Sequence, residues 1–161
     1  MSTGPFIQWE DLFVLVDDGT IPSAGYGPIE SEIREQNKVF PRGVGLLCIL
    51  PPDARPPPDE VRRAVKAALS RVASSLSSLA YVIEGTGFKG VAVRATLVGM
   101  KIFSSRPYPI YVETSLREAV DKMHSHMANG TASIDAIVNA NADARLTWKT
   151  PVPARAADDC T

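Results

Sequence analysis

Residues 81–90 read YVIEGTGFKG, an apolar segment that runs directly into three closely spaced glycines. The apolar part favours a buried strand over 79–84, and the glycines favour a tight turn. Apolar residues then recur at helical spacing, at Phe88, Val91, Ala95, Val98 and Ile102. This stretch therefore predicts a strand, a glycine turn and a helix in direct succession, which is the building unit of an α/β fold.

The same alternation continues toward the N-terminus. An apolar run over 43–50, ended by two prolines, predicts a central strand that is buried on both faces. Residues 59–73 place their apolar side chains on one helical face, and the serines at 74–78 indicate a fraying helix end. Residues 28–38 predict another helix, and residues 6–16 predict a β-hairpin with a polar centre.

The alternation also continues downstream. Residues 110–113 predict a short strand, and Ser115 and Glu118 stand three apart in the capping-box arrangement that starts a helix. Apolar positions extend that helix to Met127, and a last short helix is expected over 133–142. The order β-β-α-β-α-β-α-β-α predicts an α/β domain with a mixed, mostly parallel sheet, an N-terminal β-hairpin and helices packed on the sheet.

Length and composition limit the classes of protein that fit. The 161 residues suit one domain over 1–144, with a core at 6–128 and a flexible tail at 145–161. A formal net charge of -1 argues against a nucleic-acid partner. The longest uncharged apolar stretch is about half of the ~20 residues that a membrane span needs. With two cysteines and no recognisable secretory signal, the chain is expected to be cytoplasmic.

The segment GTGFKG, residues 85–90, matches the glycine pattern of dinucleotide-binding turns. Backbone amides in such a turn favour an anion, and Glu113 ends the next strand, where a carboxylate can contact a ribose. Against this interpretation, three strands precede the unit, Glu84 adds negative charge beside a phosphate, and Arg94 is bulky where close packing favours a small residue. A tight strand-to-helix turn in which Gly85 and Gly87 adopt positive φ is the simpler interpretation.

Metal binding and catalysis find little support in the residue pattern. His124 and His126 are two residues apart on a predicted helix, which separates them by about 200° around its axis, so they cannot share an ion. Cys48 and Cys160 complete no site of recognisable spacing. No nucleophile elbow occurs, so we expect neither catalytic residues nor a metal or other cofactor, and the chain is not expected to be an enzyme.

Two charged helix faces are candidate docking surfaces. The acidic one belongs to the predicted helix 28–38 and the basic one to the predicted helix 59–73. Most such faces are only solvated, although their opposite charges would also suit partner binding. Their members are Glu30, Glu32 and Glu35 on the first helix, and Arg62, Arg63, Lys66 and Arg71 on the second.

The order of elements, with YVIEGTGFKGVAVRATLVGMKIF at 81–103 followed by YPIYVETSLREAVDKM at 108–123, resembles the STAS family, to which the sporulation anti-anti-sigma factor belongs. The resemblance covers roughly 6–128 and implies a mixed-sheet module with four helices that works through protein contacts. In that family the turn after the third main strand holds a regulatory Ser or Thr. Thr86 is the matching hydroxyl residue, and Glu-Gly-Thr-Gly stands here in place of the family's Asp-Ser-x-Gly type of motif.

We therefore expect a non-enzymatic regulatory domain that binds a protein partner through the surface at 84–94. The residues of this candidate site are Gly85, Thr86, Gly87, Lys89, Gly90 and Arg94. Thr86 would be the switch, and Lys89 and Arg94 would meet an acidic or phosphorylated group. The alternative is a small nucleotide- or phosphate-binding protein that uses the same turn, with Glu113 on the ribose; an apolar ligand and a homo-oligomer also stay open.

Overall fold

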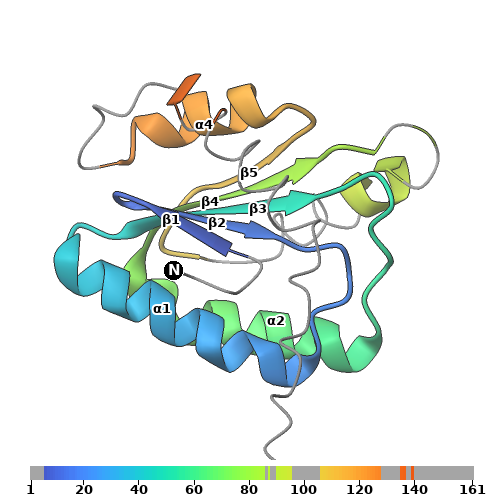
Figure 1. The fold of residues 1–161 in the computed structure, drawn as a ribbon, viewed down its shortest axis with the longest axis horizontal. Helices are drawn as coiled ribbons and strands as arrows, with labels where there is room; N and C mark the ends of the chain where they lie inside the picture. Colours follow the sequence, from blue (N-terminus) through green and yellow to red (C-terminus); the bar gives the residue numbers. More distant parts are fainter. Residues whose placement is uncertain are drawn as a thin grey trace, which may run out of the picture.

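The fold, taken from a computed structural model, is one sheet with helices on both of its faces (Figure 1). The structure describes residues 6–85, 87, 90–95, 106–127, 135–136 and 139. The elements in chain order are β1 (Phe6–Trp9), β2 (Leu12–Val16), a 3-10 turn (Ser23–Gly25), α1 (Tyr26–Val39), β3 (Val44–Leu50), α2 (Asp59–Arg71), a 3-10 turn (Ala73–Ser75), β4 (Leu76–Ile83), β5 (Ile110–Glu113) and α4 (Leu116–His124). Residues 90–95, between β4 and β5, are helical.

The five strands lie side by side in the order in which they occur along the chain. β1 and β2 are antiparallel, and β2, β3, β4 and β5 are parallel. The predicted mixed, mostly parallel sheet with an N-terminal hairpin is therefore confirmed. Because β2 to β5 are parallel, their carboxyl ends lie at the same edge of the sheet.

The hairpin between β1 and β2 turns through Glu10 and Asp11. Glu10 has a φ of +50°, in the left-handed region that non-glycine residues rarely adopt. The side chain of Gln36 in α1 supports this turn, because its Nε2 donates to the carbonyl oxygens of Glu10 at 2.5 Å and of Leu12 at 3.1 Å. One buried amide of α1 thus fixes the hairpin against the helix.

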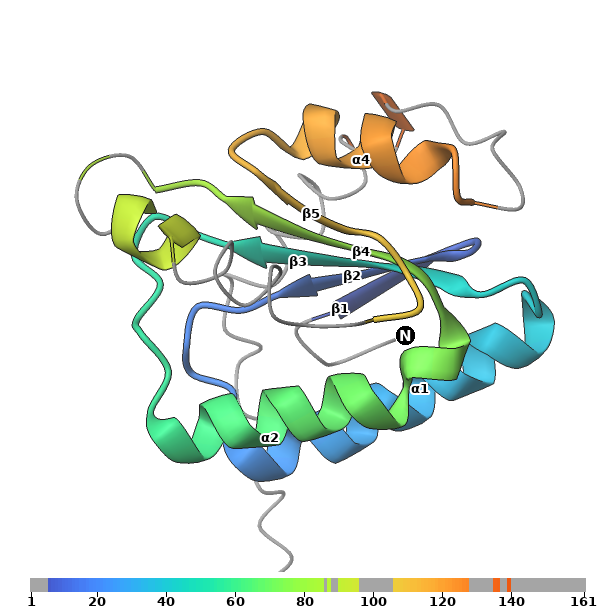
Figure 2. The same cartoon turned by 180° about the vertical axis from the view of Figure 1, so that it is seen from behind.

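Each face of the sheet carries its own apolar cluster, as the uninterrupted apolar run of β3 predicts. Leu46 and Cys48 of β3 belong to the cluster under α1 and α2, whereas Leu47 and Ile49 belong to the cluster under α4. Figure 2 shows α1 and α2 side by side below the sheet and α4 above it. Met123 of α4 is fully buried in the upper cluster.

The two helices below the sheet are tied together by charged side chains. Arg71 of α2 donates to both carboxylate oxygens of Glu30 in α1, at 2.8 and 2.5 Å. The Glu30 side chain is only 6% exposed. The prediction that Glu30 belongs to a solvated acidic face of the helix is therefore wrong, because the residue faces the neighbouring helix.

Three predicted boundaries change in the structure. Of the serines at 74–78, Ser74 and Ser75 lie in the 3-10 turn after α2, but Ser77 and Ser78 belong to β4, which begins at Leu76 and pairs with β3. α4 has the predicted cap, in which Ser115 accepts from the backbone of Glu118 at 3.5 Å, but the helix ends at His124 rather than at 127. α1 begins two residues before Pro28, which a first helical turn tolerates.

The C-terminal predictions fall largely outside the described residues. Of the predicted helix 133–142, the structure describes only positions 135, 136 and 139, and these are helical. The predicted domain end at 144 and the predicted tail at 145–161 lie outside the described residues.

Candidate functional site

The turn after β4 lies at the carboxyl edge of the parallel strands, where α/β proteins commonly place their binding sites (Figure 1). The backbone amide of Glu84 still donates to Leu50 of β3 at 3.0 Å, so the turn starts from a fixed point of the sheet. Gly87 has a φ of +94°, and the amide of Val91 donates to its carbonyl oxygen at 3.1 Å. The turn therefore passes directly into a helical segment.

Two of the three glycines in this turn are required for different reasons. Gly87 needs its positive φ, as predicted, although a Cβ atom there would meet no atom within 4 Å. Gly90 needs its small size, because a Cβ atom there would collide with the carbonyl oxygen of Gly85. Gly85 is not among the residues with positive φ, so the prediction for Gly85 is wrong. Thr86 and Lys89 lie outside the described residues.

The helical segment 90–95 presents side chains to solvent. Val91 is 65% exposed, and Arg94 and Ala95 are exposed as well. The sequence predicts a buried apolar stripe that includes Val91 and Ala95, and for these two residues the prediction is wrong. Their exposure places an apolar side chain and a cation on the same short helical surface.

Glu113, the candidate ribose contact, ends β5 beside β4, where it pairs with Val82. Glu113 is 9% exposed, and one of its carboxylate oxygens lies 2.5 Å from Nζ of Lys122 in α4. This hydrogen bond raises the pKa of the Lys122 ammonium. A ribose hydroxyl at Glu113 would compete with that ion pair, so the structure offers the nucleotide interpretation little help at this position.

The strand order also bears on the nucleotide interpretation. Dinucleotides bind doubly wound sheets in the crevice where the strand order reverses. Here the spatial order follows the chain from β1 to β5 and contains no reversal among the described strands. The glycine pattern therefore occurs in a topology that lacks the crevice in which it usually works.

The histidines do not assemble a site in the described part of the chain. Nε2 of His126 lies 2.7 Å from the hydroxyl oxygen of Tyr111 in β5, and the centroids of the two rings are 6.0 Å apart. Among the described residues no group of three His, Cys, Asp or Glu side chains is arranged to hold a metal ion. His126 acts there as a contact between the end of α4 and the sheet.

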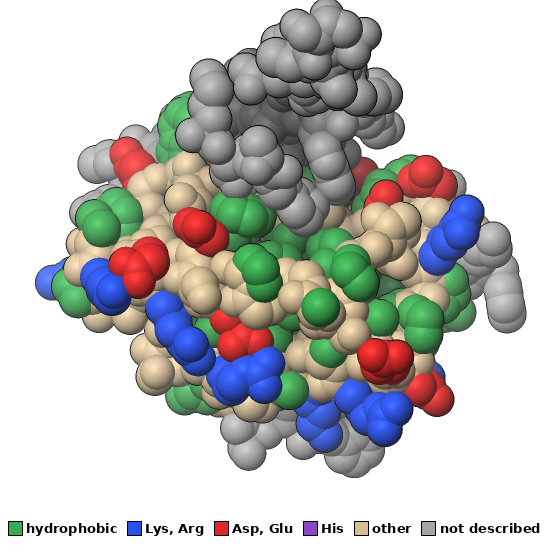
Figure 3. All heavy atoms as spheres, turned by 60° about the horizontal axis from the view of Figure 1, so that its bottom comes forward, with side chains coloured by type: hydrophobic (Ala, Val, Ile, Leu, Met, Phe, Trp, Pro, Cys, Tyr) green, Lys and Arg blue, Asp and Glu red, His purple; other side chains and the backbone are tan. Residues whose placement is uncertain are grey.

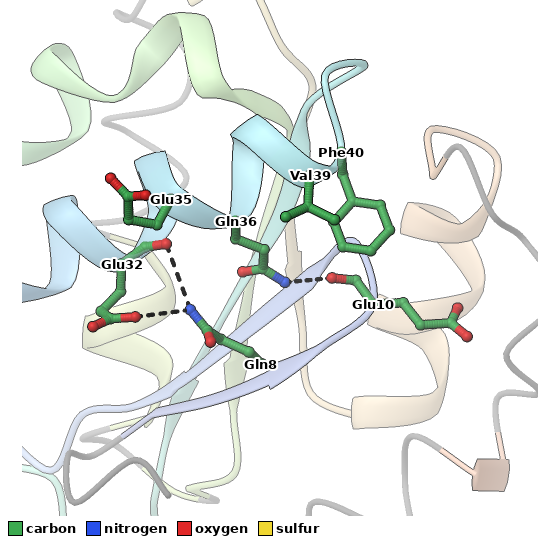
Figure 4. Close-up of a pocket in the computed structure, with 7 residues that line it drawn as sticks. All are labelled: Gln8, Glu10, Glu32, Glu35, Gln36, Val39 and Phe40. Atoms are coloured by element: carbon green, nitrogen blue, oxygen red, sulfur yellow. Dashed lines mark hydrogen bonds between the residues drawn. The ribbon is translucent and has the colours of Figure 1, made fainter.

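A hollow at the opposite end of the sheet was not predicted. It lies between the hairpin and the second half of α1 and has a volume of about 460 Å³ (Figure 4). Its lining residues are Gln8, Glu10, Glu32, Glu35, Gln36, Val39 and Phe40. The spacing of Glu32, Glu35 and Val39 marks one side of the helix, but the sequence does not tell which strand this side faces.

Comparison with known proteins gives no assignment. No family model matches the chain, and neither do curated protein sequences or solved structures. The resemblance to the STAS family consequently stays a prediction based on the order of elements. Among the described helices, none is both long enough and apolar enough to cross a bilayer.

Proposed function

We propose that the chain is a non-catalytic regulatory module that binds a protein partner through the surface at 84–94. The observation that carries this proposal is the exposure of Val91, at 65%, beside the exposed cation of Arg94. In the described residues only one other large hydrophobic side chain, that of Val39, is as open to solvent. An apolar residue next to an arginine is the composition that anchors many protein interfaces.

The surroundings support a rigid recognition surface. Hydrogen bonds join the loops at this edge of the sheet: the amide of Asp17 donates to Ile49 at 2.9 Å, and the amide of Arg55 donates to Asp18 at 3.0 Å. A surface that needs little ordering on binding loses less conformational entropy. The side chain of Arg94 would meet a carboxylate or phosphate of the partner, and Thr86 in the same turn is the residue at which a phosphate would alter docking.

Site-specific crosslinking in cells tests this proposal. A photoreactive residue replaces Val91 in one variant and Asp121, on the exposed side of α4, in a matched control. We expect a discrete crosslinked species from position 91 that is absent from position 121. Adding Arg94→Glu should remove that species while leaving the thermal unfolding unchanged. Identical species from both positions, or a species that ignores Arg94→Glu, would contradict the proposal.

A ligand panel separates the nucleotide- or phosphate-binding alternative. Two features favour an anion at this turn: a Cβ atom at Gly87 would meet none of the described residues within 4 Å, and a helical segment begins close by. A nucleotide at a hundred times its dissociation constant stabilises a binder by about 2.7 kcal/mol. A thermal shift with ATP, GTP, NAD or NADP that Gly87→Asp abolishes would favour the alternative over the protein-binding proposal.

A further inference from the structure

The outer edge of the four-residue strand β1 carries no charge, proline or bulge that would oppose pairing. Edge strands are commonly blocked by charged residues, proline or a bulge. The four residues of β1 read FIQW and include neither a charge nor a proline, and their register with β2 is regular. Within the described part of the chain no strand pairs with this outer edge. Its backbone groups are therefore placed to accept a further strand.

Carboxylates line the hollow below this edge. Glu32 and Glu35 of α1 and Glu10 of the hairpin turn are lining residues, and in Figure 4 the carboxylate of Glu10 points away from Gln36 while its carbonyl oxygen faces it. Lys38 pairs with Glu35 at 2.6 Å, whereas Glu32 is contacted by the neutral amide of Gln8 at 3.2 Å. The hollow is lined by three glutamates, and Lys38 pairs with one of them. The net charge around the hollow is therefore negative. Figure 3 shows Lys and Arg side chains along this face from its left margin to its lower right, with Asp and Glu side chains among them.

A buried amide oxygen lacks a partner in the same hollow. Gln36 is 7% exposed, and its Nε2 donates the hydrogen bonds to Glu10 and Leu12. Its Oε1 accepts no hydrogen bond from the described residues. In Figure 4 this oxygen is directed away from the Glu10 carbonyl, toward the side of Gln8 and Glu32. Because the contacts of the exposed Gln8 to Glu32 are long, at 3.2 and 3.5 Å, an incoming donor can displace Gln8 and reach the oxygen.

The direction of the side chains in β1 defines the pattern of a partner strand. Phe6 packs into the cluster on the α1 side, and Ile7 and Trp9 pack into the cluster on the α4 side. A strand added about 4.8 Å away would alternate in the same way. Its residues on the α1 side would meet the carboxylates, and those on the other side would meet Ile7 and Trp9.

We propose that the open edge of β1 and the acidic hollow beside it bind an extended segment of another protein in which basic and apolar residues alternate. Main-chain hydrogen bonds to β1 would provide affinity. The ammonium or guanidinium groups would contact Glu10, Glu32 and Glu35 and donate to Oε1 of Gln36, and Val39, 71% exposed, would pack on their aliphatic stems.

This surface is separate from the turn at 84–94. The hairpin adjoins the amino ends of the parallel strands, because the amide of Gly45 at the start of β3 donates to Asp11 at 2.8 Å. The turn follows the carboxyl end of β4. The chain would therefore hold two partners at opposite ends of one sheet. An experiment that contradicts binding at one surface leaves the proposal for the other surface intact.

The probe is a fluorescein-labelled peptide of alternating Lys and Val, six residues long, titrated into the full chain with anisotropy as readout. We expect saturable binding that weakens with salt, and slower amide exchange at residues 6–9 in the complex. The double variant Glu32→Gln/Glu35→Gln should bind roughly three- to tenfold more weakly, as expected for partly exposed ion pairs. Asp121→Asn, which removes a carboxylate from the exposed side of α4, should leave the affinity unchanged.

Two further peptides decide whether a strand is added. Two versions of the peptide carry N-methyl groups, one on the odd-numbered and one on the even-numbered residues, and each version loses its backbone donors along one edge. The version that loses the donors facing β1 should bind at least tenfold more weakly than the other. Equal binding of both methylated peptides would overturn the proposal, as would equal binding of a Glu-Val peptide or the absence of binding. Full displacement by spermidine without protection of residues 6–9 would show a small-cation site instead and would also overturn it.

Discussion

Arg71 in α2 holds Glu30 in α1 through two hydrogen bonds, Nε to Oε2 at 2.8 Å and Nη2 to Oε1 at 2.5 Å. Planar two-point contacts of this kind are the strongest geometry available to an arginine and a carboxylate. The carboxylate is almost fully buried, whereas the guanidinium is half exposed. The pair therefore fixes the lateral position of two helices that lie on the same face of the sheet.

The first prediction concerns this pair. The hydrogen bond from Arg71 holds the pKa of Glu30 below its ordinary value, with burial opposing the shift. Glu30→Gln should lower the free energy of unfolding by about 1 kcal/mol at neutral pH, because half of the pair is solvated. Since the folded state lowers the pKa, this contribution is complete at neutral pH and is lost as the pH falls below about 4.

Urea unfolding of both proteins between neutral and acidic pH checks this prediction. The difference between Glu30→Gln and the unmodified chain should shrink as the pH falls. Glu35→Gln removes an exposed carboxylate from the same helix and serves as the control. A Glu30→Gln penalty that stays constant down to the lowest pH would show that packing, not the ion pair, causes the loss.

The pair also shows what the sequence can and cannot predict. The hairpin, β3, β5 and the cores of α1, α2 and α4 follow from apolar periodicity, because each of these segments buries one side or both. Glu30 was assigned to a solvated face, since periodicity cannot tell that a second helix lies alongside α1. The assignment of Ser77 and Ser78 to a helix end was wrong for a related reason: pairing with β3 overrode weak local propensity.

The two candidate surfaces differ in the same way. Gly87 was predicted from its position between a strand and a helix, and a local backbone angle decides its role. The hollow depends on Gln8 of β1 facing Glu32 of α1, residues that are 24 positions apart in the chain. A contact of this range depends on sheet register and helix docking, and neither is visible in one sequence.

The second prediction concerns Met123 of α4, the helix that packs on the upper face of the sheet. The Met123 side chain is 0% exposed to solvent. It packs in the apolar cluster between α4 and the sheet, close to Gly45. Met123→Ala should lower the free energy of unfolding by about 3 kcal/mol, the sum of lost apolar burial and a residual cavity. Asp121→Ala, on the exposed side of α4, should change it by less than about 0.5 kcal/mol. Chemical denaturation of the three proteins measures both values, and equal effects would contradict the packing of α4.

The third prediction concerns the thiol of Cys48 in β3. Burial, with a smaller contribution from the negative charge of Asp17, raises its pKa far above the usual range. Thiolate is the reactive form, so Cys48 should resist maleimide in the folded protein. In a Cys160→Ser variant, which leaves one thiol, labelling should be slow in buffer and rapid in denaturant. Rapid labelling in buffer would show that the sheet opens far more often than its buried core implies.

The last prediction separates backbone angle from space in the turn after β4. Gly87→Ala should cost about 1–2 kcal/mol of folding free energy, because the new side chain meets no atom within 4 Å but the φ of +94° disfavours it. Gly90→Ala should cost more, since its Cβ atom would collide with the carbonyl oxygen of Gly85. Gly27→Ala, in the first turn of α1 and also without close atoms, should be neutral or stabilising by up to about 1 kcal/mol. Thermal and urea unfolding rank the three variants, and a Gly87→Ala protein as stable as Gly27→Ala would show that the turn relaxes without its left-handed glycine.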